Sequence, residues 1–456
     1  MERVAVSTAV DISYGPPFGV LRALAAHIGY PIAEALEHRA VSPKLRELKR
    51  YYQQDAAWRR TEQRQRLGRM IAFAASEVPY YRDLFTSRGF DAERLAADPE
   101  RLADLPLLTK TIIMEQGERL LSRPLSEVRH HAVTTGGSTG RKATLYYDQE
   151  AADYSSAVTA FVRGAIGAGR SRSCLHFAAR LPDTPVERWP NRETMKCLSM
   201  NRSNIFFDAV DAAALEEIWQ VLRRRRPYLV HGHPSTLYAL ADYVRTRYPG
   251  RRDQPFRVFE SSGEVLHDYQ AKAILEAFGA RVVDRYGLAE FGVIAYQFGD
   301  GDRLDVLDSE AWIEPVATDE DGLASLVVAG LRNRLMPLIR YETGDLAEIS
   351  GHAGGEGLMR MVGRQHDVVD IAGVPHLTHF VQDVMDHRIR GIKDFQIDNR
   401  TTPPVLRVVL EDPGSAEEKR RAIEQFWPGA FSVEFVGLDD MVRVGWRAKF
   451  RHVVSA

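Results

Sequence analysis

The chain has 456 residues, 45% hydrophobic and 27% charged, a composition typical of a folded globular protein that is too long for a single core. Lys and Arg number 60 against 62 Asp and Glu, so the formal net charge of -2 gives no electrostatic reason to expect nucleic acid or an anionic membrane as the main partner. The two cysteines, Cys174 and Cys197, have neither CxxC spacing nor adjacent histidines, which favours a reducing compartment over a zinc site or a disulfide framework. Because the sequence shows no signal-peptide pattern and no apolar run of about eighteen residues, we expect a cytoplasmic protein without a membrane partner.

Residues 43–77 have helical spacing and are strongly basic. Such a segment suits a nucleic acid or a lipid, but its interspersed acids and apolar positions favour a solvated helix face. Pro79 ends this segment, and Thr109 is expected to cap a further helix.

A glycine-rich stretch, Thr134-Thr-Gly-Gly-Ser-Thr-Gly-Arg-Lys142, is the most informative part of the chain. Glycines let the backbone turn tightly and approach a ligand, and main-chain amides, hydroxyls and cations together suit a polyphosphate. We therefore interpret the stretch as a triphosphate-binding loop. The residues assigned to it are Thr135, Gly136, Gly137, Ser138, Thr139, Gly140, Arg141 and Lys142.

Other motifs and a plain surface turn compete with this interpretation. No GxxxxGK[ST] can be aligned, and GxGxxG opening a helix is absent, so neither a Walker A loop nor a dinucleotide fingerprint fits. Residues 136–140 do satisfy GxSxG, the nucleophile elbow of hydrolases, which would make Ser138 a nucleophile. That elbow leads from a strand into a helix, whereas the alternation of residues 143–147 predicts a loop between two strands. A glycine-rich surface turn remains the plain alternative.

Beyond this loop, short strands alternate with helices. Helices are expected over 148–167, 211–222, 236–245 and 268–278, and strands over 228–231, 257–259 and 281–284, with Ser235 as a helix cap. The arginines at 223–226 either grip phosphate or complement a helix dipole, and the second is the plainer account. This alternation predicts a parallel α/β sheet with ligands at the carboxyl ends of its strands.

From residue 305 the chain becomes strand-rich, and beyond residue 364 the expected order is β-α-β-β-α-β. We therefore predict an α/β protein: a large domain over 1–363, with mostly parallel sheets, helices and a β-rich subdomain, and a small mobile ferredoxin-like α+β domain over 364–456.

Taken in order, these motifs resemble those of the adenylate-forming superfamily of acyl-CoA synthetases, and most closely its phenylacetate–CoA ligase-like branch. The resemblance covers nearly the whole chain and rests on VPYYR, LPLLTK, TTGGSTGRK, SSGEVL, RYGLAE, YETGD, GRQHD and WRAKFR. It implies ATP and Mg²⁺ as cofactors, a small carboxylic acid as substrate and coenzyme A as the acyl acceptor. Neither nucleic acid nor membrane is implied as a partner, and a homodimer is left open.

The resemblance also implies roles for single residues, and these roles make chemical sense. Adenylation brings a carboxylate to the α-phosphate of ATP, so catalysis is mainly charge neutralisation and alignment. Lys449 is similar to the mobile catalytic lysine, Arg364 to the nucleotide-contacting arginine near the hinge, and Glu290 to the Mg²⁺ ligand. Asp345 is similar to the ribose-binding aspartate. The residues expected at or near adenine are Ser262, Gly263, Glu264, Tyr286 and Gly287.

The same resemblance places the acyl pocket around the loop carrying His231 and His233, the segment before Ser261 and the residues near Tyr286 and Gly292. The acyl-site residues it implies are His231, His233, Ser261, Tyr286 and Gly292, with an aromatic acid expected from the branch. As a lone loop histidine, His233 is equally well explained by a structural role.

Three departures from the family pattern accompany the match. Trp446-Arg-Ala-Lys449 replaces the usual small residues, His366 stands where an acid or lysine is common, and the loop reads GGST. The first hypothesis is a carboxylate–CoA ligase. A second delivers the adenylate to an amine or a carrier-protein thiol, and a third is a nucleotide-binding module without catalysis.

Overall fold

The computed structural model describes residues 10–13, 19–134, 143–179, 192–207, 212–317, 322–350, 357–364, 368–371, 374–377, 381, 384–444 and 449–454. The chain divides into two compact units. Unit 1 contains Met1–Ala26, Ser171–Val282 and Gly363–Ala456, and unit 2 contains His27–Arg170 and Val283–Val362. Within the described ranges, no helix is long and apolar enough to cross a membrane.

The main sheet of unit 1 has six strands in the order β1-β5-β4-β6-β7-β8. Its strands are β1 (Val10–Ser13), β4 (Cys174–Ala179), β5 (Arg202–Phe207), β6 (Leu229–Gly232), β7 (Val258–Ser261) and β8 (Arg281–Val283). Strands β5, β4, β6 and β7 run parallel, while β1 pairs with β5 antiparallel. The predicted parallel sheet is thereby confirmed.

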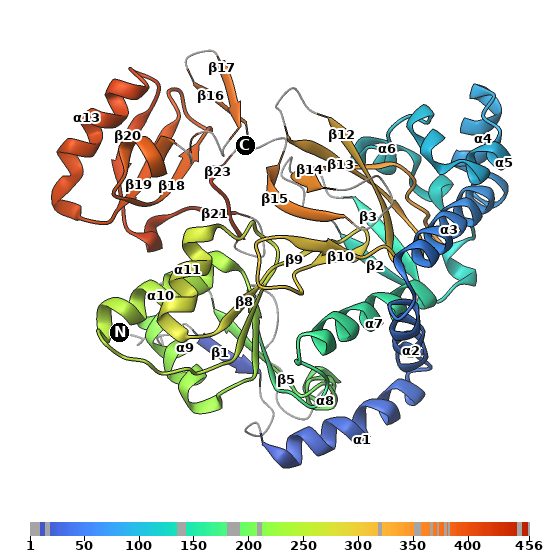
Figure 1. Cartoon of the computed structure of the whole chain (residues 1–456), viewed down its shortest axis with the longest axis horizontal. Helices are drawn as coiled ribbons and strands as arrows, with labels where there is room; N and C mark the ends of the chain where they lie inside the picture. The colour runs from blue at the N-terminus through green and yellow to red at the C-terminus, as the bar shows by residue number, and fades with distance from the viewer. Residues whose placement is uncertain are drawn as a thin grey trace, which may run out of the picture. The chain divides into compact units, whose positions relative to one another are not determined.

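Helices α9, α10 and α11, green to yellow in Figure 1, cover one face of this sheet. The helices of this part are α8 (Arg192–Ser199), α9 (Ala212–Arg225), α10 (Pro234–Arg247) and α11 (Asp268–Phe278). Three arginines fall in the last turn of α9, where they complement the helix dipole as expected. Ser235, predicted as the cap of α10, lies inside the helix, because Pro234 occupies the first turn and His233 is the N-cap.

The C-terminal part of unit 1 contains a four-stranded sheet in the order β20-β19-β18-β23. Its elements are β16 (Val368–Ile371), β17 (Val374–Leu377), η4 (Val384–Ile389), β18 (Ile392–Asp398), β19 (Val405–Leu410), η5 (Pro413–Ser415), α13 (Ala416–Phe426), β20 (Ser432–Phe435), η6 (Leu438–Asp440), β21 (Arg443–Val444), β22 (Lys449–Phe450) and β23 (Val453–Val454). This α+β part differs from the predicted order at its first strand. Strand β16 was expected in the main sheet, but it pairs with β17 in a separate hairpin. The sheet edge beside β18 is instead occupied by β23 from the chain end.

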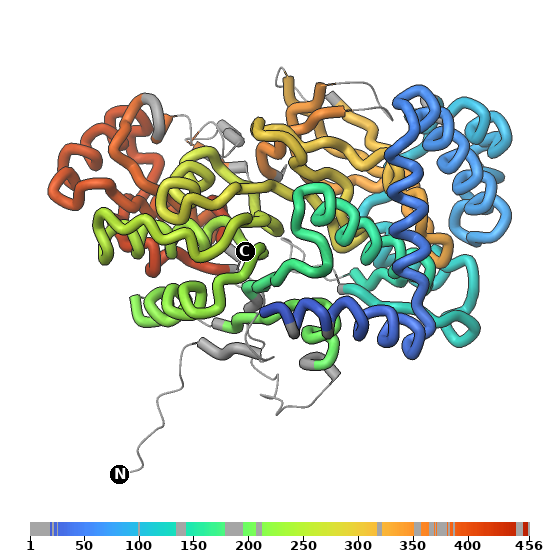
Figure 2. Tube along the Cα trace, turned by 60° about the horizontal axis from the view of Figure 1, so that its bottom comes forward, coloured from blue at the N-terminus to red at the C-terminus, as the bar shows by residue number. Residues whose placement is uncertain are grey.

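This C-terminal part packs against α10 of the same unit. Tyr238 Oη donates to the Lys393 carbonyl at 3.2 Å, and the Lys393 ammonium pairs with Asp242. Figure 2 shows the red C-terminal trace beside the yellow-green helices. The predicted division of the chain at residue 363 stays a prediction.

Unit 2 begins within α1 (Val20–Leu36) and contains most of the N-terminal helices. Its helical elements are α2 (Val41–Tyr51), α3 (Ala56–Glu77), α4 (Pro79–Arg88), α5 (Ala92–Ala97), η1 (Pro99–Asp104), α6 (Lys110–Gln116), η2 (Gly117–Leu120), η3 (Leu125–Glu127) and α7 (Gln149–Ala165). The predicted cap at Thr109 is confirmed by its hydrogen bond from the Ile112 amide at 3.2 Å.

The basic segment over 43–77 forms two helices, and part of its charge is buried. Arg59 pairs with Asp308 at 3.0 Å and Arg66 with Glu62 at 2.8 Å, and both arginine side chains are at most 14% exposed. The interpretation as a solvated face is therefore wrong for these two residues, because acids from the β-rich part and from α3 itself neutralise them.

The β-rich part of unit 2 is a seven-stranded sheet in the order β12-β13-β14-β15-β11-β10-β9. Its strands are β9 (Arg285–Leu288), β10 (Gly292–Tyr296), β11 (Leu304–Val306), β12 (Ala311–Ala317), β13 (Ala324–Gly330), β14 (Tyr341–Ser350) and β15 (Leu358–Arg364). A separate hairpin, β2 (His130–Thr134) with β3 (Thr144–Asp148), precedes α7. The strand-rich region expected from residue 305 is confirmed.

Candidate functional site

The glycine-rich loop joins two antiparallel strands. Strands β2 and β3 pair along their full lengths, with Thr134 opposite Thr144. A nucleophile elbow needs a helix directly after the loop, and here a strand follows. This context confirms the predicted strand–loop–strand and disfavours the hydrolase reading of Ser138. The loop residues 135–142 themselves, including Arg141 and Lys142, lie outside the described residues.

In unit 2, two residues predicted at the nucleotide are bound to each other. Tyr286, on β9, donates its hydroxyl to Asp345 Oδ2 on β14 at 2.8 Å. Both side chains are nearly buried, at 8% and 4% exposure. The Asp345 amide also donates to Thr343 Oγ1 at 3.0 Å. Hydrogen bonds therefore hold both the carboxylate and the backbone of Asp345. A held carboxylate is suited to accept hydrogen bonds from a vicinal diol.

Glu290, the predicted metal ligand, lies in the turn between β9 and β10. Its Oε1 accepts a hydrogen bond from Tyr341 Oη at 2.9 Å, and the hydroxyl of Tyr147 donates to the carbonyl of the preceding Ala289. Burial, followed by the nearby Glu290 carboxylate, raises the pKa of Tyr147, so this phenol stays protonated and keeps its donor. Two tyrosines from other strands thus hold the turn. Neither was given a role in the sequence analysis, although Tyr341 is the first residue of the YETGD motif.

Two glycines make the β9–β10 hairpin possible. Gly292 has φ +74°, and a Cβ there would lie 2.7 Å from Ser155 Oγ of α7. A Cβ on Gly287 would meet the Gly292 carbonyl oxygen at 2.8 Å. The neighbouring Phe291 and Ser155 line a small pocket whose other walls carry both apolar side chains and Arg332. Gly292 was predicted at the acyl group, and this assignment stays a prediction.

In unit 1, the predicted acyl residues lie at the ends of β6 and β7. His231 Nδ1 lies 2.9 Å from Glu260 Oε2, and the Glu260 side chain is fully buried. His233 Nδ1 bonds the Ser262 carbonyl at 3.0 Å. Ser261 is buried, and strand alternation places it with Phe259 on the face packed against the helices. Glu260 was missed, although its place one residue before a strand end is the signal that could have found it.

Glu264, in the predicted adenine segment, joins three parts of unit 1. Its Oε2 accepts from the Ser235 amide at 3.3 Å, at the start of α10. Its Oε1 accepts from the Phe450 amide of β22 at 2.7 Å. Arg443 of β21 donates to Ser235 Oγ at 3.4 Å, and burial lowers the pKa of Arg443 while Glu264 opposes that shift. The carboxylate therefore anchors the β21–β22 hairpin.

The predicted catalytic lysine begins β22. The Lys449 backbone pairs with Val444 and directly precedes the anchored Phe450 amide. Arg364 is the last residue of β15. The side chains of Lys449 and Arg364, and the whole of His366, lie outside what the structure describes. Ser262 and Gly263 follow β7, and Gly263 has φ +90°.

No family model matches the chain. It is 25% identical over 337 residues to a phenylacetate–coenzyme A ligase from Pseudomonas putida, covering 69% of this chain and 72% of that protein. It is 26% identical over 336 residues to the phenylacetate–coenzyme A ligase of Thermus thermophilus, with the same coverage. A 2-hydroxyisobutyryl-CoA ligase solved in the postadenylation state has a TM-score of 0.67 at 19% identity, covering 88% of this chain and 90% of that chain.

The chain therefore resembles phenylacetate–CoA ligases in sequence, and its fold is that of the adenylate-forming CoA ligases. The predicted fold class agrees with this placement, since the α/β sheet of unit 1 and the β-rich sheet of unit 2 belong to that fold.

The residues around Glu290 suit a magnesium ion. Mg²⁺ is usually held by one or two carboxylates together with substrate phosphates and water. Glu290 supplies one partly exposed carboxylate whose Oε1 is oriented by Tyr341. Among the described residues, no cluster of three or more His, Cys, Asp or Glu could hold a metal ion.

Proposed function

We propose that the chain is an ATP-dependent carboxylate–CoA ligase. A carboxylate oxygen of an organic acid attacks the α-phosphorus of ATP, the bond to the β-phosphate breaks, and pyrophosphate leaves. The sulfur of coenzyme A then attacks the acyl carbon of the adenylate, AMP leaves, and the thiol proton passes to solvent. By similarity to its relatives, we propose an aromatic acid as the substrate.

The proposed residue roles follow from the negative charges of the triphosphate and from the hydroxyls of the ribose, which the protein must bind. Ser138, Thr139 and the glycine amides of their loop would bind the β- and γ-phosphates, and Lys142 would add positive charge. Asp345 would accept hydrogen bonds from the ribose hydroxyls. Glu290 would hold Mg²⁺, which neutralises phosphate charge when bound.

The main support for this proposal is the pair of oriented carboxylates in unit 2. Tyr286 holds Asp345 at 2.8 Å and Tyr341 holds Glu290 at 2.9 Å. Buried or half-buried carboxylates are costly unless they are hydrogen-bonded, and each of these two is held by a phenolic hydroxyl. One carboxylate can accept hydrogen bonds from the ribose hydroxyls of a nucleotide, and another can bind the magnesium ion at its phosphates.

The decisive test is acid-dependent exchange of labelled pyrophosphate into ATP over a broad panel of carboxylic acids. We expect exchange with at least one acid. The reaction is then run with CoA, with amines and without an acceptor, and mass spectrometry should detect a thioester in the reaction with CoA. Exchange that yields an amide instead would favour the amide synthetase. Absence of exchange with every acid would favour a nucleotide-binding module without catalysis.

Replacement of Lys449 tests the proposed catalytic cation. Lys449→Ala should slow adenylation on the order of a hundredfold, comparable to the loss of one transition-state donor. Lys419→Ala is a matched control, since this lysine lies on α13 and pairs with the adjacent Glu418. An exchange rate equal to that of the unmodified protein would refute the assignment of Lys449.

A further inference from the structure

Arginines are concentrated in the connections that lead into strands β6 and β7 of unit 1. From the last turn of α9 to the residue before β7, the chain contains nine arginines, no lysine and two acids, Asp242 and Asp253. Asp242 already pairs with Lys393. Asp253 is shared by Arg223 at 3.2 Å and Arg251 at 2.7 Å. The net charge of -2 therefore averages a strongly basic part of the chain with an acidic remainder.

The topology brings these arginines to one edge of the sheet. Between parallel strands the connecting helix runs back, so it ends at the edge where the next strand begins. Helices α9 and α10 therefore end at the edge where β6 and β7 start (Figure 1). The Arg226 side chain donates to the Gln254 carbonyl at 3.3 Å, and the Arg281 amide to the Arg257 carbonyl at 2.9 Å. We call this region, from the ends of α9 and α10 to Arg281, the arginine edge.

Helix dipoles explain only part of this charge. Three arginines in the last turn of α9 and two in the last turn of α10 complement the dipoles of their helices. Arg226, Arg252 and Arg257 lie outside the helices, in the connections that follow them. Solvated faces usually mix the two signs of charge, because like charges at high density repel and lower stability. The excess of arginine therefore indicates a partner with negative charge.

The arginine edge lies at the other end of the strands from the candidate site residues of unit 1. His231 and Glu260 stand near the carboxyl ends of β6 and β7, where open α/β sheets bind ligands. The C-terminal part contacts the starts of the helices, through Tyr238 of α10 and His267 of α11. A partner at the arginine edge therefore leaves these residues uncovered, and the inference does not rest on the proposed function.

The aromatic rings of the arginine edge do not favour nucleic acid. Proteins that bind single strands combine cations with aromatic rings on which the bases stack. The Tyr248 ring instead carries the guanidinium groups of Arg247 and Arg251, 5.7 and 5.5 Å from its centroid, and Trp219 is buried. A duplex groove is read by a helix or a β-ribbon that lies in it, whereas this edge presents helix ends and short loops.

A protein partner is not favoured either, because the centre of a protein–protein interface is usually apolar or aromatic. Among the described residues, none of the exposed large apolar side chains lies in the connections before β6 and β7. The exposed residues of 245–252 are arginine, threonine, proline and glycine. An anionic lipid surface needs no apolar centre, because it attracts arginine by charge alone.

We propose that the arginine edge docks on a membrane surface that carries anionic lipids, with its guanidinium groups bound to lipid phosphates. The planar guanidinium fork matches the oxygens of a phosphate group. Several short segments that end at one edge can reach the same lipid surface together. This docking uses charge and involves no segment that crosses the bilayer.

Co-sedimentation of the full-length protein with lipid vesicles tests this inference. Phosphatidylcholine vesicles with about 30% phosphatidylglycerol should bind the protein about tenfold or more tighter than pure phosphatidylcholine vesicles. Salt at about 0.5 M, where the Debye length is about 4 Å, should remove the difference. Equal binding to both vesicles, or binding to neither, would overturn the inference. Tighter binding to single-stranded or duplex oligonucleotides than to the anionic vesicles would overturn it in favour of nucleic acid.

A triple variant assigns the binding to the arginine edge. Arg224→Gln/Arg247→Gln/Arg252→Gln removes three exposed charges from the ends of α9 and α10 and the loop before β7. Each arginine near an anionic surface contributes about fivefold, so the affinity for anionic vesicles should fall on the order of a hundredfold. If circular dichroism shows that this variant does not fold, the single loop variant Arg252→Gln decides, with an expected loss of about fivefold.

The matched control removes three exposed arginines from elsewhere in the chain. Arg60→Gln/Arg420→Gln/Arg421→Gln changes the net charge equally, on α3 and α13. Its affinity for anionic vesicles should fall by about threefold or less, since charges beyond a Debye length are screened. Equal losses in the two triple variants would show that net charge and not the arginine edge attracts the lipid, which would overturn the inference.

Discussion

At the scale of single residues, the candidate site depends on tyrosines that orient carboxylates. Tyr286 holds Asp345, and Tyr341 holds Glu290, each through one phenolic hydroxyl. Such partners fix the direction of the acceptor to which they are hydrogen-bonded. They therefore affect binding through geometry.

We expect Tyr286→Phe to weaken nucleotide binding about tenfold, since Asp345 loses the donor that orients it and the ring itself is kept. Calorimetric titration with AMP measures this directly. Tyr243→Phe is the control, because that hydroxyl bonds Glu216 on the surface of unit 1. An unchanged dissociation constant in Tyr286→Phe would show that Asp345 does not bind the ribose or needs no orientation.

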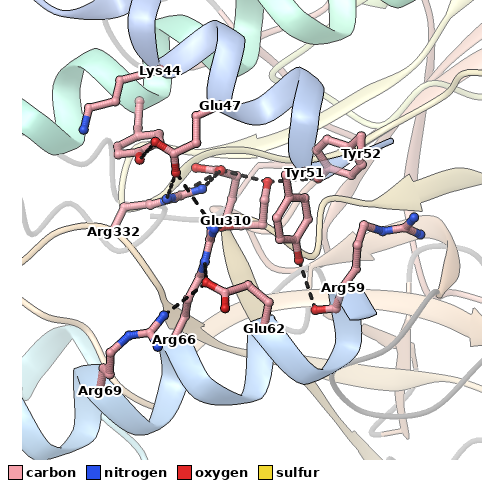
Figure 3. A network of polar contacts seen from close by, with 12 residues as sticks. Lys44, Glu47, Tyr51, Tyr52, Arg59, Glu62, Arg66, Arg69, Glu310 and Arg332 are labelled. Carbon is pink, nitrogen blue, oxygen red and sulfur yellow. Dashed lines mark hydrogen bonds and ion pairs between the residues drawn. The ribbon is translucent and has the colours of Figure 1, made fainter. Parts of the chain in front are cut away.

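A second residue-scale feature is the charge network between α2, α3 and the β-rich part of unit 2 (Figure 3). Arg332 donates to Glu310 at 3.1 Å, and its guanidinium stacks 3.8 Å from the ring centroid of Tyr154. Glu47 lies 3.7 Å from the same guanidinium. Burial alone would lower the pKa of Arg332, but the charge of Glu310 and the other neighbours raise it, so this residue is a permanent cation.

Breaking this network from one side should be costly. Glu310→Gln should lower the free energy of unfolding by about 3 kcal/mol, because it removes the buried carboxylate that lies nearest to a buried cation. Urea denaturation measures the loss, and the double variant Glu310→Gln/Arg332→Met should recover part of it. Asp104→Asn removes an exposed pair and should change stability by about 1 kcal/mol or less. A Glu310→Gln protein as stable as the Asp104→Asn protein would contradict the prediction.

At the scale of elements, the β21–β22 hairpin is held by a carboxylate from the loop after β7. Glu264 accepts from the Phe450 amide at 2.7 Å, directly beside Lys449. A charge-assisted hydrogen bond of this length is stronger than a neutral one. Glu264 is therefore a positioning residue for the strand that carries the proposed catalytic lysine.

Loss of the hydrogen bond from the Phe450 amide to Glu264 should slow adenylation more than it slows transfer of the acyl group to CoA. Glu264→Ala should slow adenylation about tenfold, while transfer from a supplied acyl-adenylate to CoA changes less than about twofold. Glu264→Gln, which keeps a neutral acceptor, should fall between. The control is Glu276→Ala, an exposed carboxylate of α11. Equal slowing of both half-reactions would indicate a general structural effect instead.

At the scale of the whole molecule, unit 1 is assembled from three distant segments, and two histidines meet where two of them join. The rings of His267, at the start of α11, and His452, near the chain end, lie 4.8 Å apart at nearly right angles. His452 Nε2 is also 3.2 Å from Asp394, and the ring of Tyr269 stacks on His267. Burial, with a smaller contribution from His452, lowers the pKa of His267 well below its ordinary value of 6.5.

This shift makes stability depend on pH in a definite direction. Below about pH 6.5 the unfolded chain binds a proton at this residue that the folded chain resists, so stability falls as the pH falls. We expect Tm to decrease between pH 7 and pH 5, with a smaller decrease in His267→Asn, which keeps a helix-capping acceptor. Calorimetric scans across this range are the measurement, and the same slope in both proteins would rule out His267 as the source.

Much of the fold was predictable from the sequence, because local rules decide it. Helix α11 has the predicted bounds, Thr109 caps its helix, and the strand–helix alternation gives the parallel sheet. Periodicity and capping act over a few residues, so a short window contains the whole signal. The motifs RYGLAE, YETGD and SSGEVL were recognisable for the same reason, since each is a continuous stretch.

The sequence by itself thus determined the type and order of most elements, the resemblance to adenylate-forming ligases and the positions of the motif residues. The tertiary structure decided the partners of these residues: Tyr341 for Glu290, Glu260 for His231, and Phe450 for Glu264. It also placed β23 at a sheet edge expected for another strand and buried two arginines of a helix that looked solvated. The physical reason is that hydrogen bonds and ion pairs join whatever folding brings within about 3 Å, and chain distance carries no information about that separation.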